Sequence, residues 1–179
     1  MENYYIEKEY KMMLEEKQFN TIINGLNFDK INVQTNHYYS CPNNMGMRVR
    51  ELNGRYFFTL KHFINNEVRE YEWEINDLSL NDSRIKDLFE ELKIESYQYL
   101  GELKTTRYLK YYELGELCLD KNEYLNICDY ELEYELKNAK TDDFQTLVNL
   151  LANFNLEFET NKITKYKRFI DRLEEIKWK

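Results

Sequence analysis

Charged and apolar side chains alternate along several segments of this chain, and the alternation restricts the folds that the chain can adopt. In residues 70–75, Glu holds every second position, and Tyr, Trp and Ile fill the positions between. Successive side chains of a β-strand point to opposite faces, so such a segment predicts a strand with one charged and one apolar face. The chain is therefore expected to build an antiparallel sheet whose core lies on one side.

The same alternation recurs along most of the chain. Its charged and polar members are Glu7, Glu9 and Lys11; Arg48 and Arg50; Thr59 and Lys61; Glu70, Glu72 and Glu74; Thr105 and Arg107; and Asp129, Glu131, Glu133 and Glu135. Two structures are compatible with this pattern. The sheet can stay open with its charged face in water, or it can close into a barrel whose charged faces line a polar lumen. Periodicity alone does not distinguish between them.

Turn residues and apolar spacing divide the chain into groups of strands separated by helices. Strands are predicted near 4–13 and at 37–41, 45–52, 55–63, 67–75, 97–112, 114–119 and 129–136, with a polar turn at 120–122. Helices are predicted at 15–26, from Asn81 or Asp82 to Leu92, from Thr141 onward and at roughly 164–178. Short turns between consecutive strands, such as Asn53-Gly54, indicate antiparallel hairpins.

Length and composition narrow the class of protein. The 179 residues suffice for one domain with a proper core and contain no linker, so residues 1–179 are predicted to form a single domain. A net charge of -8 argues against a surface adapted to nucleic acid, although a local basic cavity remains compatible with it. The three cysteines form no C-x-x-C pair and are expected as free thiols in a reducing compartment. Without a long apolar run, we expect a cytoplasmic protein with no membrane partner.

The charged residue types suit phosphoryl chemistry. Lys and Arg neutralise a polyphosphate, and the planar guanidinium matches phosphate oxygens. Mg²⁺ and Mn²⁺ prefer hard oxygen ligands, usually one or two carboxylates together with substrate phosphates and water. The chain has no glycine-rich phosphate loop, so side chains on the strands would have to hold the phosphates.

Taken in order, the charged motifs form a recognisable series. They are Glu7-x-Glu9-x-Lys11, Met47-Arg48-Val49-Arg50, Thr59-Leu60-Lys61, Arg69-Glu70-Tyr71-Glu72, Thr106-Arg107, Leu119-Asp120, Asp129-Tyr130-Glu131-Leu132-Glu133, and Lys165 with Arg168. This series resembles the CYTH superfamily, also called triphosphate tunnel metalloenzymes, in its bacterial form. The resemblance covers nearly the whole chain. It implies an α+β fold, in which an eight-stranded antiparallel β-barrel forms a triphosphate tunnel and helices pack outside.

The resemblance also implies roles for individual residues. The metal ligands for Mg²⁺ or Mn²⁺ would be Glu7, Glu9, Glu131 and Glu133. The groups that hold phosphate oxygens and assist catalysis would be Lys11, Arg48, Arg50, Lys61, Arg107 and Lys165, with Arg168 as a further substrate-binding residue. Glu70, Glu72 and Asp120 would orient these groups or serve a second metal.

By this resemblance the chain is a divalent-metal-dependent triphosphate hydrolase acting on a small-molecule triphosphate. Inorganic triphosphate is the preferred substrate, since the motifs include no evident aromatic clamp for a base, and a metal-activated water is the preferred nucleophile. Two alternatives stay open. The same fold could carry a class IV-type adenylate cyclase or a thiamine triphosphatase, or the chain could be a non-catalytic module that binds polyphosphate or nucleotide. A monomer and a homodimer are both compatible with the sequence.

Overall fold

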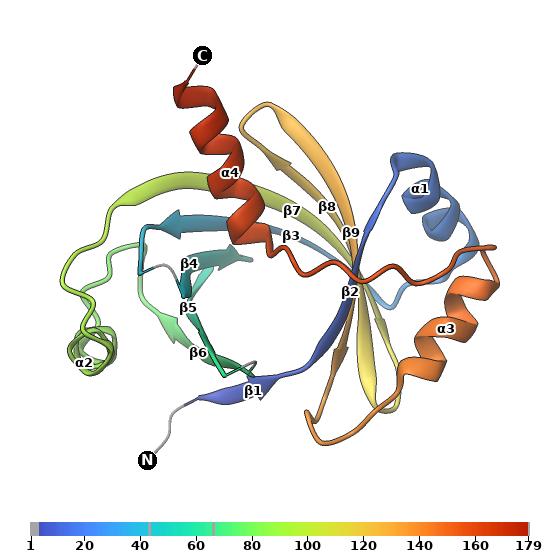
Figure 1. Ribbon diagram of the computed structural model, residues 1–179, viewed down its shortest axis with the longest axis horizontal. Coiled ribbons are helices and arrows are strands. Elements are labelled where there is room, and N and C mark those ends of the chain that lie inside the picture. Colours follow the sequence, from blue (N-terminus) through green and yellow to red (C-terminus); the bar gives the residue numbers. More distant parts are fainter. Residues whose placement is uncertain (1–3, 43, 66, 179) are drawn as a thin grey trace. The chain divides into compact units, whose positions relative to one another are not determined.

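The computed structural model describes residues 4–42, 44–65 and 67–178 (Figure 1). The elements in this part of the chain are β1 (Tyr5–Glu7), β2 (Glu9–Leu14), α1 (Glu16–Gly25), β3 (Lys30–Tyr39), β4 (Met45–Leu52), β5 (Arg55–Ile64), β6 (Glu67–Ile75), α2 (Ser83–Leu92), β7 (Tyr99–Tyr111), β8 (Gly115–Tyr124), β9 (Ile127–Leu136), α3 (Phe144–Ala152) and α4 (Lys165–Lys177).

The strands hydrogen-bond in the order β1-β6-β5-β4-β3-β7-β8-β9-β2. β1 and β2 stand at opposite ends of this order, although only Lys8 separates them along the chain. Strands close into a barrel when the last of the order returns to the first. The predicted fold class, an α+β antiparallel β-barrel with helices packed outside, is confirmed. It has nine strands where eight were predicted, because the first strand is divided at Lys8.

The chain comprises two compact units, which are described separately. The first contains the described residues of Met1–Ile6 and Gln34–Leu103, and the second those of Glu7–Val33 and Lys104–Lys179. In both, the apolar members of the alternating segments face a core and the charged members face the opposite side of the strands.

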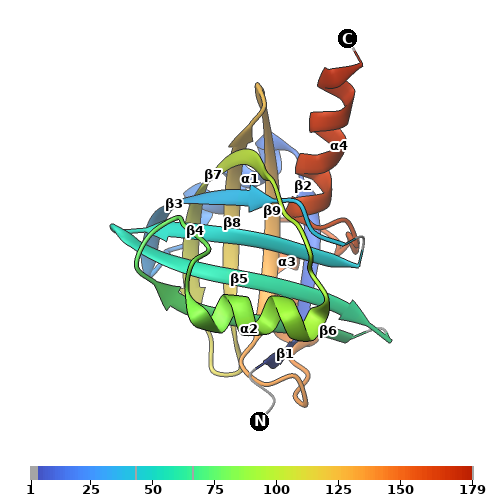
Figure 2. The same ribbon diagram turned by 90° about the vertical axis from the view of Figure 1, so that its left-hand side faces the viewer.

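The core of the first unit lies between the apolar faces of β4 to β6 and the helix α2. Val49, Phe58 and Leu60 are wholly buried, as is Ile85 of α2. Figure 2 shows α2 lying across these strands. Asp82 fixes the start of the helix, because its side chain accepts a hydrogen bond from the backbone N–H of Arg84 at 2.9 Å.

The core of the second unit lies between β2, β8 and β9 on one side and the helices α1 and α3 on the other. Leu119 and Leu132 come from the strands, Ile22 from α1 and Leu151 from α3, and all four are almost wholly buried. The fourth helix joins the unit through Phe169, whose ring centroid lies 6.0 Å from that of Tyr124.

Two predicted boundaries are wrong. β3 begins at Lys30 and not at His37. The polar face of its first half carries neutral Asn and Gln, so the alternation of charged and apolar residues does not reveal this part of the strand. β8 runs through the predicted turn at 120–122 and ends at Tyr124. The true turn is at Leu125 and Asn126, which have φ angles of 44° and 62°. Asp120 and Asn122 resemble turn residues in composition, but both side chains are wholly buried.

Two further properties concern the described residues alone. Cys41, Cys118 and Cys128 are free thiols. In the ranges given above, no helix combines the length and the apolar composition needed to cross a membrane.

Gly115 at the start of β8 tests the packing of the second unit. A Cβ at this position would lie 2.7 Å from the carbonyl oxygen of Glu135 and 2.9 Å from Cζ of the buried Tyr134. Gly115→Ala is therefore expected to lower the free energy of unfolding by about 1–3 kcal/mol in urea denaturation. Gly54→Asn is the control, since Gly54 has no atom within 4 Å and Asn tolerates its φ of +74°. Equal losses in both variants would contradict this account.

Candidate functional site

Lys165 is the centre of the charged face of the second unit. It is the first residue of α4, because Thr164 caps the helix by accepting a hydrogen bond from the backbone N–H of Lys167 at 3.1 Å. Its Nζ lies 2.9 Å from Asp120, 3.0 Å from Glu131 and 2.8 Å from Glu133. One buried ammonium group thus meets three carboxylates.

Arg107 supplies the second positive charge of this face. It stands directly opposite Asp120 in the register of β7 and β8. Its Nε and Nη2 donate to the two oxygens of Asp120 at 2.8 and 2.7 Å, and Nη2 also donates to Glu133 at 2.6 Å. This two-pronged contact holds the guanidinium plane in one orientation.

Burial and charge act in opposite directions on these carboxylates. Burial by itself would raise the pKa of Glu133, but Lys165, Arg107 and Lys11 outweigh it and hold the pKa well below its usual range. Burial likewise raises the pKa of Asp120, but the positive charge of Arg107 outweighs it, and the pKa is lowered. Burial dominates for Glu131, whose pKa is raised in spite of Lys165. Glu131 thus differs from Glu133 and Asp120 in the direction of its pKa shift, although Arg168 and Lys165 both contact it.

The predicted E-x-E-x-K residues lie along two strands. Glu7 ends β1, while Glu9 and Lys11 belong to β2, where Lys11 stands opposite Glu133. Lys11 Nζ donates to Glu9 at 2.6 Å. The register therefore brings Lys11 next to Glu133 of the Lys165 cluster.

The oxygen ligands of this face suit a divalent metal ion. Glu131 Oε2 accepts from Arg168 and lies near Lys165, whereas the buried Oε1 has no hydrogen-bond partner among the described residues. Yet no three His, Cys, Asp or Glu side chains of the described ranges converge as a ready-made metal site. Mg²⁺ commonly takes one or two carboxylates and completes its shell with substrate phosphates. The residues therefore fit a metal that binds together with a phosphate ligand.

The charged face of the first unit is more basic. Lys61 Nζ lies 3.3 Å from Glu70, and Thr59 donates to Glu72 at 3.0 Å. Arg48 stands opposite Thr59 on the same face, and Arg50 Nη1 lies 4.0 Å from Glu72. The structure thus brings the predicted residues of β4, β5 and β6 together.

Three residues on this face were missed from the sequence. Asn36 and Tyr38 of β3 stand opposite Arg50 and Arg48. Phe57 stands opposite Arg50 from β5, so an aromatic ring does lie on the charged face. Asn36 is wholly buried, and neither of its amide atoms has a hydrogen-bond partner among the described residues. The alternation of Ile31 and Val33 with polar residues was the signal that could have extended β3.

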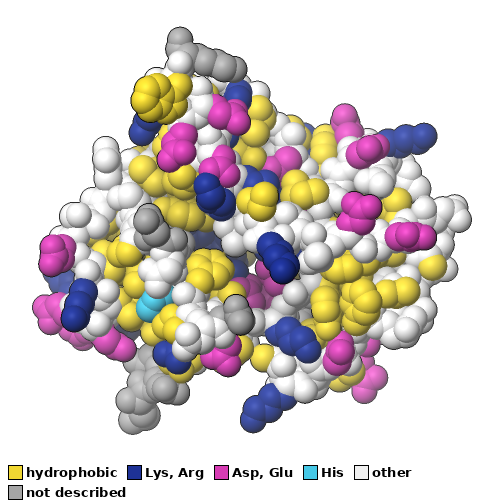
Figure 3. Space-filling model, in the orientation of Figure 1, with side chains coloured by type: hydrophobic (Ala, Val, Ile, Leu, Met, Phe, Trp, Pro, Cys, Tyr) yellow, Lys and Arg dark blue, Asp and Glu magenta, His cyan; other side chains and the backbone are white. Residues whose placement is uncertain are grey.

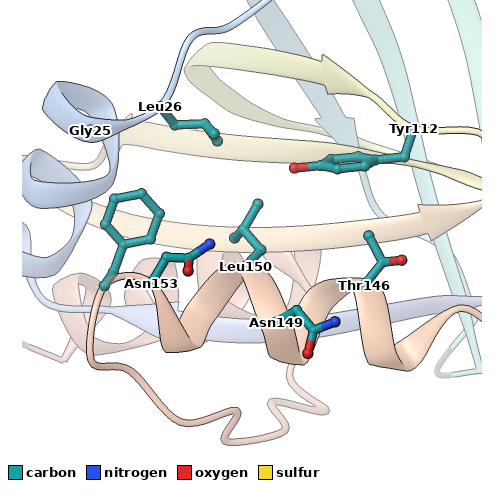
Figure 4. Close-up of a pocket in the computed structure, with 8 residues that line it drawn as sticks. Gly25, Leu26, Tyr112, Thr146, Asn149, Leu150 and Asn153 are labelled. Carbon is teal, nitrogen blue, oxygen red and sulfur yellow. The ribbon is translucent and has the colours of Figure 1, made fainter.

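A separate pocket of about 690 Å³ lies in the second unit (Figure 4). It is lined by Gly25, Leu26, Tyr112, Thr146, Asn149, Leu150, Asn153 and Phe154. None of these side chains is charged, so the pocket offers nothing to neutralise a polyphosphate. On the face in Figure 3, acidic and basic side chains are interspersed with apolar ones, without a broad area of one sign.

Glu70 predicts a pH dependence of stability. Burial raises its pKa, but Lys61 and Arg48 outweigh burial and hold the pKa below the usual 4.5. A lowered pKa in the folded state gives stability that is present above 4.5 and is lost as the pH falls through the folded-state pKa. Relative to wild type, Glu70→Gln should lose free energy of unfolding at pH 7 and show a flatter decline below about pH 4.5 in denaturant titrations. The exposed Glu67→Gln should follow wild type. A decline in Glu70→Gln parallel to wild type would contradict the assignment.

Comparisons with known proteins agree with this geometry. The CYTH domain model matches residues 5–169. "Putative triphosphatase YjbK" of Bacillus subtilis (strain 168) is 32% identical over 179 residues, which covers 90% of this chain and 94% of that protein. A crystal structure of a "putative adenylate cyclase" from Bacillus halodurans is 26% identical with a TM-score of 0.76, covering 93% of this chain and 98% of that one.

A more distant structure shares the fold alone. It is a Hippeastrum protein described as a "putative adenylyl cyclase" with a dominant triphosphatase activity. It is 21% identical with a TM-score of 0.71, covering 92% of this chain and 95% of that one. The motif series, the divided first strand and the paired charges of the sheet thus accompany a family match over most of the sequence, and this chain belongs to the CYTH domain family.

Proposed function

We propose that this chain is a metal-dependent triphosphatase that hydrolyses inorganic triphosphate. The observation that carries the proposal is the cluster in which Lys165 and Arg107 meet the buried carboxylates of Asp120, Glu131 and Glu133. The CYTH domain match and the triphosphatase relative support a hydrolase. We further propose that both compact units belong to one domain, since the family match extends over both.

The paired charges prepare the protein for a metal and a polyphosphate together. A triphosphate competes with the carboxylates for Lys165 and Arg107, because it offers several anionic oxygens. The carboxylates released in this way are then available to a divalent cation. The basic groups are already gathered on this face before substrate binds, so phosphate oxygens can replace carboxylates as their partners.

The residues divide into three roles in this proposal. Phosphate oxygens would be held by Lys11, Arg48, Arg50, Lys61, Arg107 and Lys165. The metal would be held by Glu7, Glu9, Glu131 and Glu133, and Glu70, Glu72 and Asp120 would orient the basic groups. When bound, Mg²⁺ or Mn²⁺ withdraws charge from the phosphate oxygens and lowers the pKa of water. Asp120 would hold the Arg107 guanidinium toward the charge that develops on the phosphates.

Cyclisation of ATP is a second candidate. Phe57 lies on the charged face of the first unit, where its aromatic ring could stack on a nucleobase. The Bacillus halodurans neighbour is described as a "putative adenylate cyclase". Cyclic AMP formed from ATP faster than phosphate is released from triphosphate would favour this function over the first.

Phosphate release from triphosphate tests the proposed function directly. With Mg²⁺ or Mn²⁺ the purified chain should release orthophosphate, and Lys165→Met should lower kcat/KM by about 10²-fold or more because a phosphate-binding charge is lost. Lys167→Met is the matched control, since Lys167 lies on the same helix but is exposed and paired with Asp171. Thermal melts of both variants report on folding. An inactive wild type, or a fully active and folded Lys165→Met, would refute the proposal.

Metal binding should depend on the phosphate ligand. Electron paramagnetic resonance of Mn²⁺ should show weak binding to the protein alone and at least about tenfold tighter binding with the non-hydrolysable imidotriphosphate, because its oxygens complete the metal shell. Glu131→Gln should lose most of the gain, whereas Glu123→Gln, on the opposite face of β8, should keep it. Tight Mn²⁺ binding without any phosphate compound would instead indicate a preformed metal site.

A further inference from the structure

The guanidinium of Arg168 is almost fully engaged within the protein. Nε donates to Asp129 at 2.9 Å, Nη2 donates to Glu131 at 2.6 Å, and Nη1 donates to the carbonyl of Ile163 at 3.1 Å. The side chain is only 12% exposed. Each of its three nitrogens therefore already has an acceptor, and two of these acceptors, Asp129 and the Ile163 carbonyl, are not groups to which the proposed function assigns a metal or a phosphate.

Asp129, which binds Arg168 alongside Glu131, is fixed in turn by hydrogen bonds on the sheet. It accepts from Asn122 at 2.9 Å and from the Tyr124 hydroxyl at 2.7 Å. Asn122 accepts from Thr105 at 2.8 Å, and both of these residues are wholly buried. The cross-strand register aligns Thr105, Asn122 and Asp129 across β7, β8 and β9. Asp129 is thus the end of a hydrogen-bond chain that spans three strands.

The contacts of Arg168 set the position of Lys165. The two residues are three apart on α4 and so share a face of the helix. Both also reach Oε2 of Glu131, Arg168 at 2.6 Å and Lys165 at 3.0 Å. If α4 rotated or slid on β9, Lys165 would be withdrawn from its carboxylates. The contacts of Arg168 with Asp129 and Glu131 oppose such a movement.

We propose that Arg168 and Asp129 are positioning residues, a latch that seats α4 on β9 and so holds Lys165 in the charged cluster. This inference rests on the proposed function and replaces the predicted role of Arg168 as a phosphate ligand. Arg168 and Asp129 are largely shielded from bulk water, so removal of one partner leaves the charge of the other uncompensated and destabilises the protein. Loss of either partner should therefore have nearly the consequence of losing both.

The two possible roles of Arg168 predict opposite results. If Arg168 forms a latch with Asp129, Arg168→Ala and Asp129→Ala should each lower kcat for triphosphate by about tenfold or more, with KM changed less than about threefold. The double variant should be no worse than Arg168→Ala, because removal of Arg168 already breaks its contact with Asp129. Arg168→Lys should not restore kcat, since an ammonium cannot bridge Asp129, Glu131 and the Ile163 carbonyl together.

Direct phosphate binding by Arg168 would overturn the proposal. In that case Arg168→Ala would raise KM, Asp129→Ala would free the guanidinium and leave kcat unchanged, and Arg168→Lys would recover activity. Asp171→Ala is the matched control, because it breaks the exposed pair with Lys167 on the same helix. It should leave kcat and KM at wild-type values, and an equal loss in this variant would also overturn the proposal.

Hydrogen exchange tests the latch without relying on activity. Asp129→Ala should speed amide exchange in residues 165–169 by about tenfold or more, while Asp171→Ala should leave that turn unchanged. This measurement stays informative if the chain proves not to hydrolyse triphosphate, so failure of the proposed function and failure of the latch are distinguishable. Unchanged exchange in Asp129→Ala would overturn the latch even in an active triphosphatase.

Discussion

Pairing of opposite charges on the charged side of the strands is the interaction on which the rest of this structure depends. Asp120 and Glu131 are wholly inaccessible to solvent. A buried carboxylate without a partner costs several kcal/mol, so these strands are stable only with cations beside them. Arg107 comes from a neighbouring strand, but Lys165 and Arg168 come from a helix at the other end of the chain. The acidic strands β8 and β9 therefore need α4 packed against them to be stable.

The same pairing explains how a chain with more acidic than basic residues can be suited to anions. Some of its acidic residues lie on strand faces that also contain Lys and Arg. On these faces the positive and negative side chains neutralise one another. A polyanion can enter such a face only if something else neutralises the carboxylates it displaces. A divalent cation is small and can neutralise these carboxylates, so binding of the polyanion and binding of the cation favour each other.

Much of the fold follows from local pattern. The predicted bounds of β4 and β6 match the structure, because each strand contains an alternating stretch, Met47–Arg50 in β4 and Glu70–Ile75 in β6, between clear turns. The start of β3 was missed because neutral amides mark its buried polar face. The end of β8 was missed because Asp-Lys-Asn has the composition of a turn, and only the partners across the sheet show that it is a strand. The division at Lys8 likewise depends on two different partner strands, which no local pattern contains.

The candidate site shows the same limit. The residues of β4, β5 and β6 could be grouped from the sequence, since adjacent hairpins bring them together in a known register. The contact between Arg168 and Asp129 joins residues 39 positions apart, and the role of Arg168 depends on which acceptors surround it. From the sequence, Arg168 was predicted to bind the phosphates of the substrate. Only the geometry shows that its donors are already engaged.

The arrangement of the two units also bears on how the protein forms during synthesis. Most of the first unit is one continuous stretch, Gln34–Leu103, whereas the second joins Glu7–Val33 to Lys104–Lys179. β2 therefore leaves the ribosome long before β9, the strand with which it pairs. Until then the apolar side chains of Met12 and Leu14, buried in the finished core, have no strand beside them. Translation speed and chaperone capture should therefore matter more for β2 than for the hairpins of the first unit.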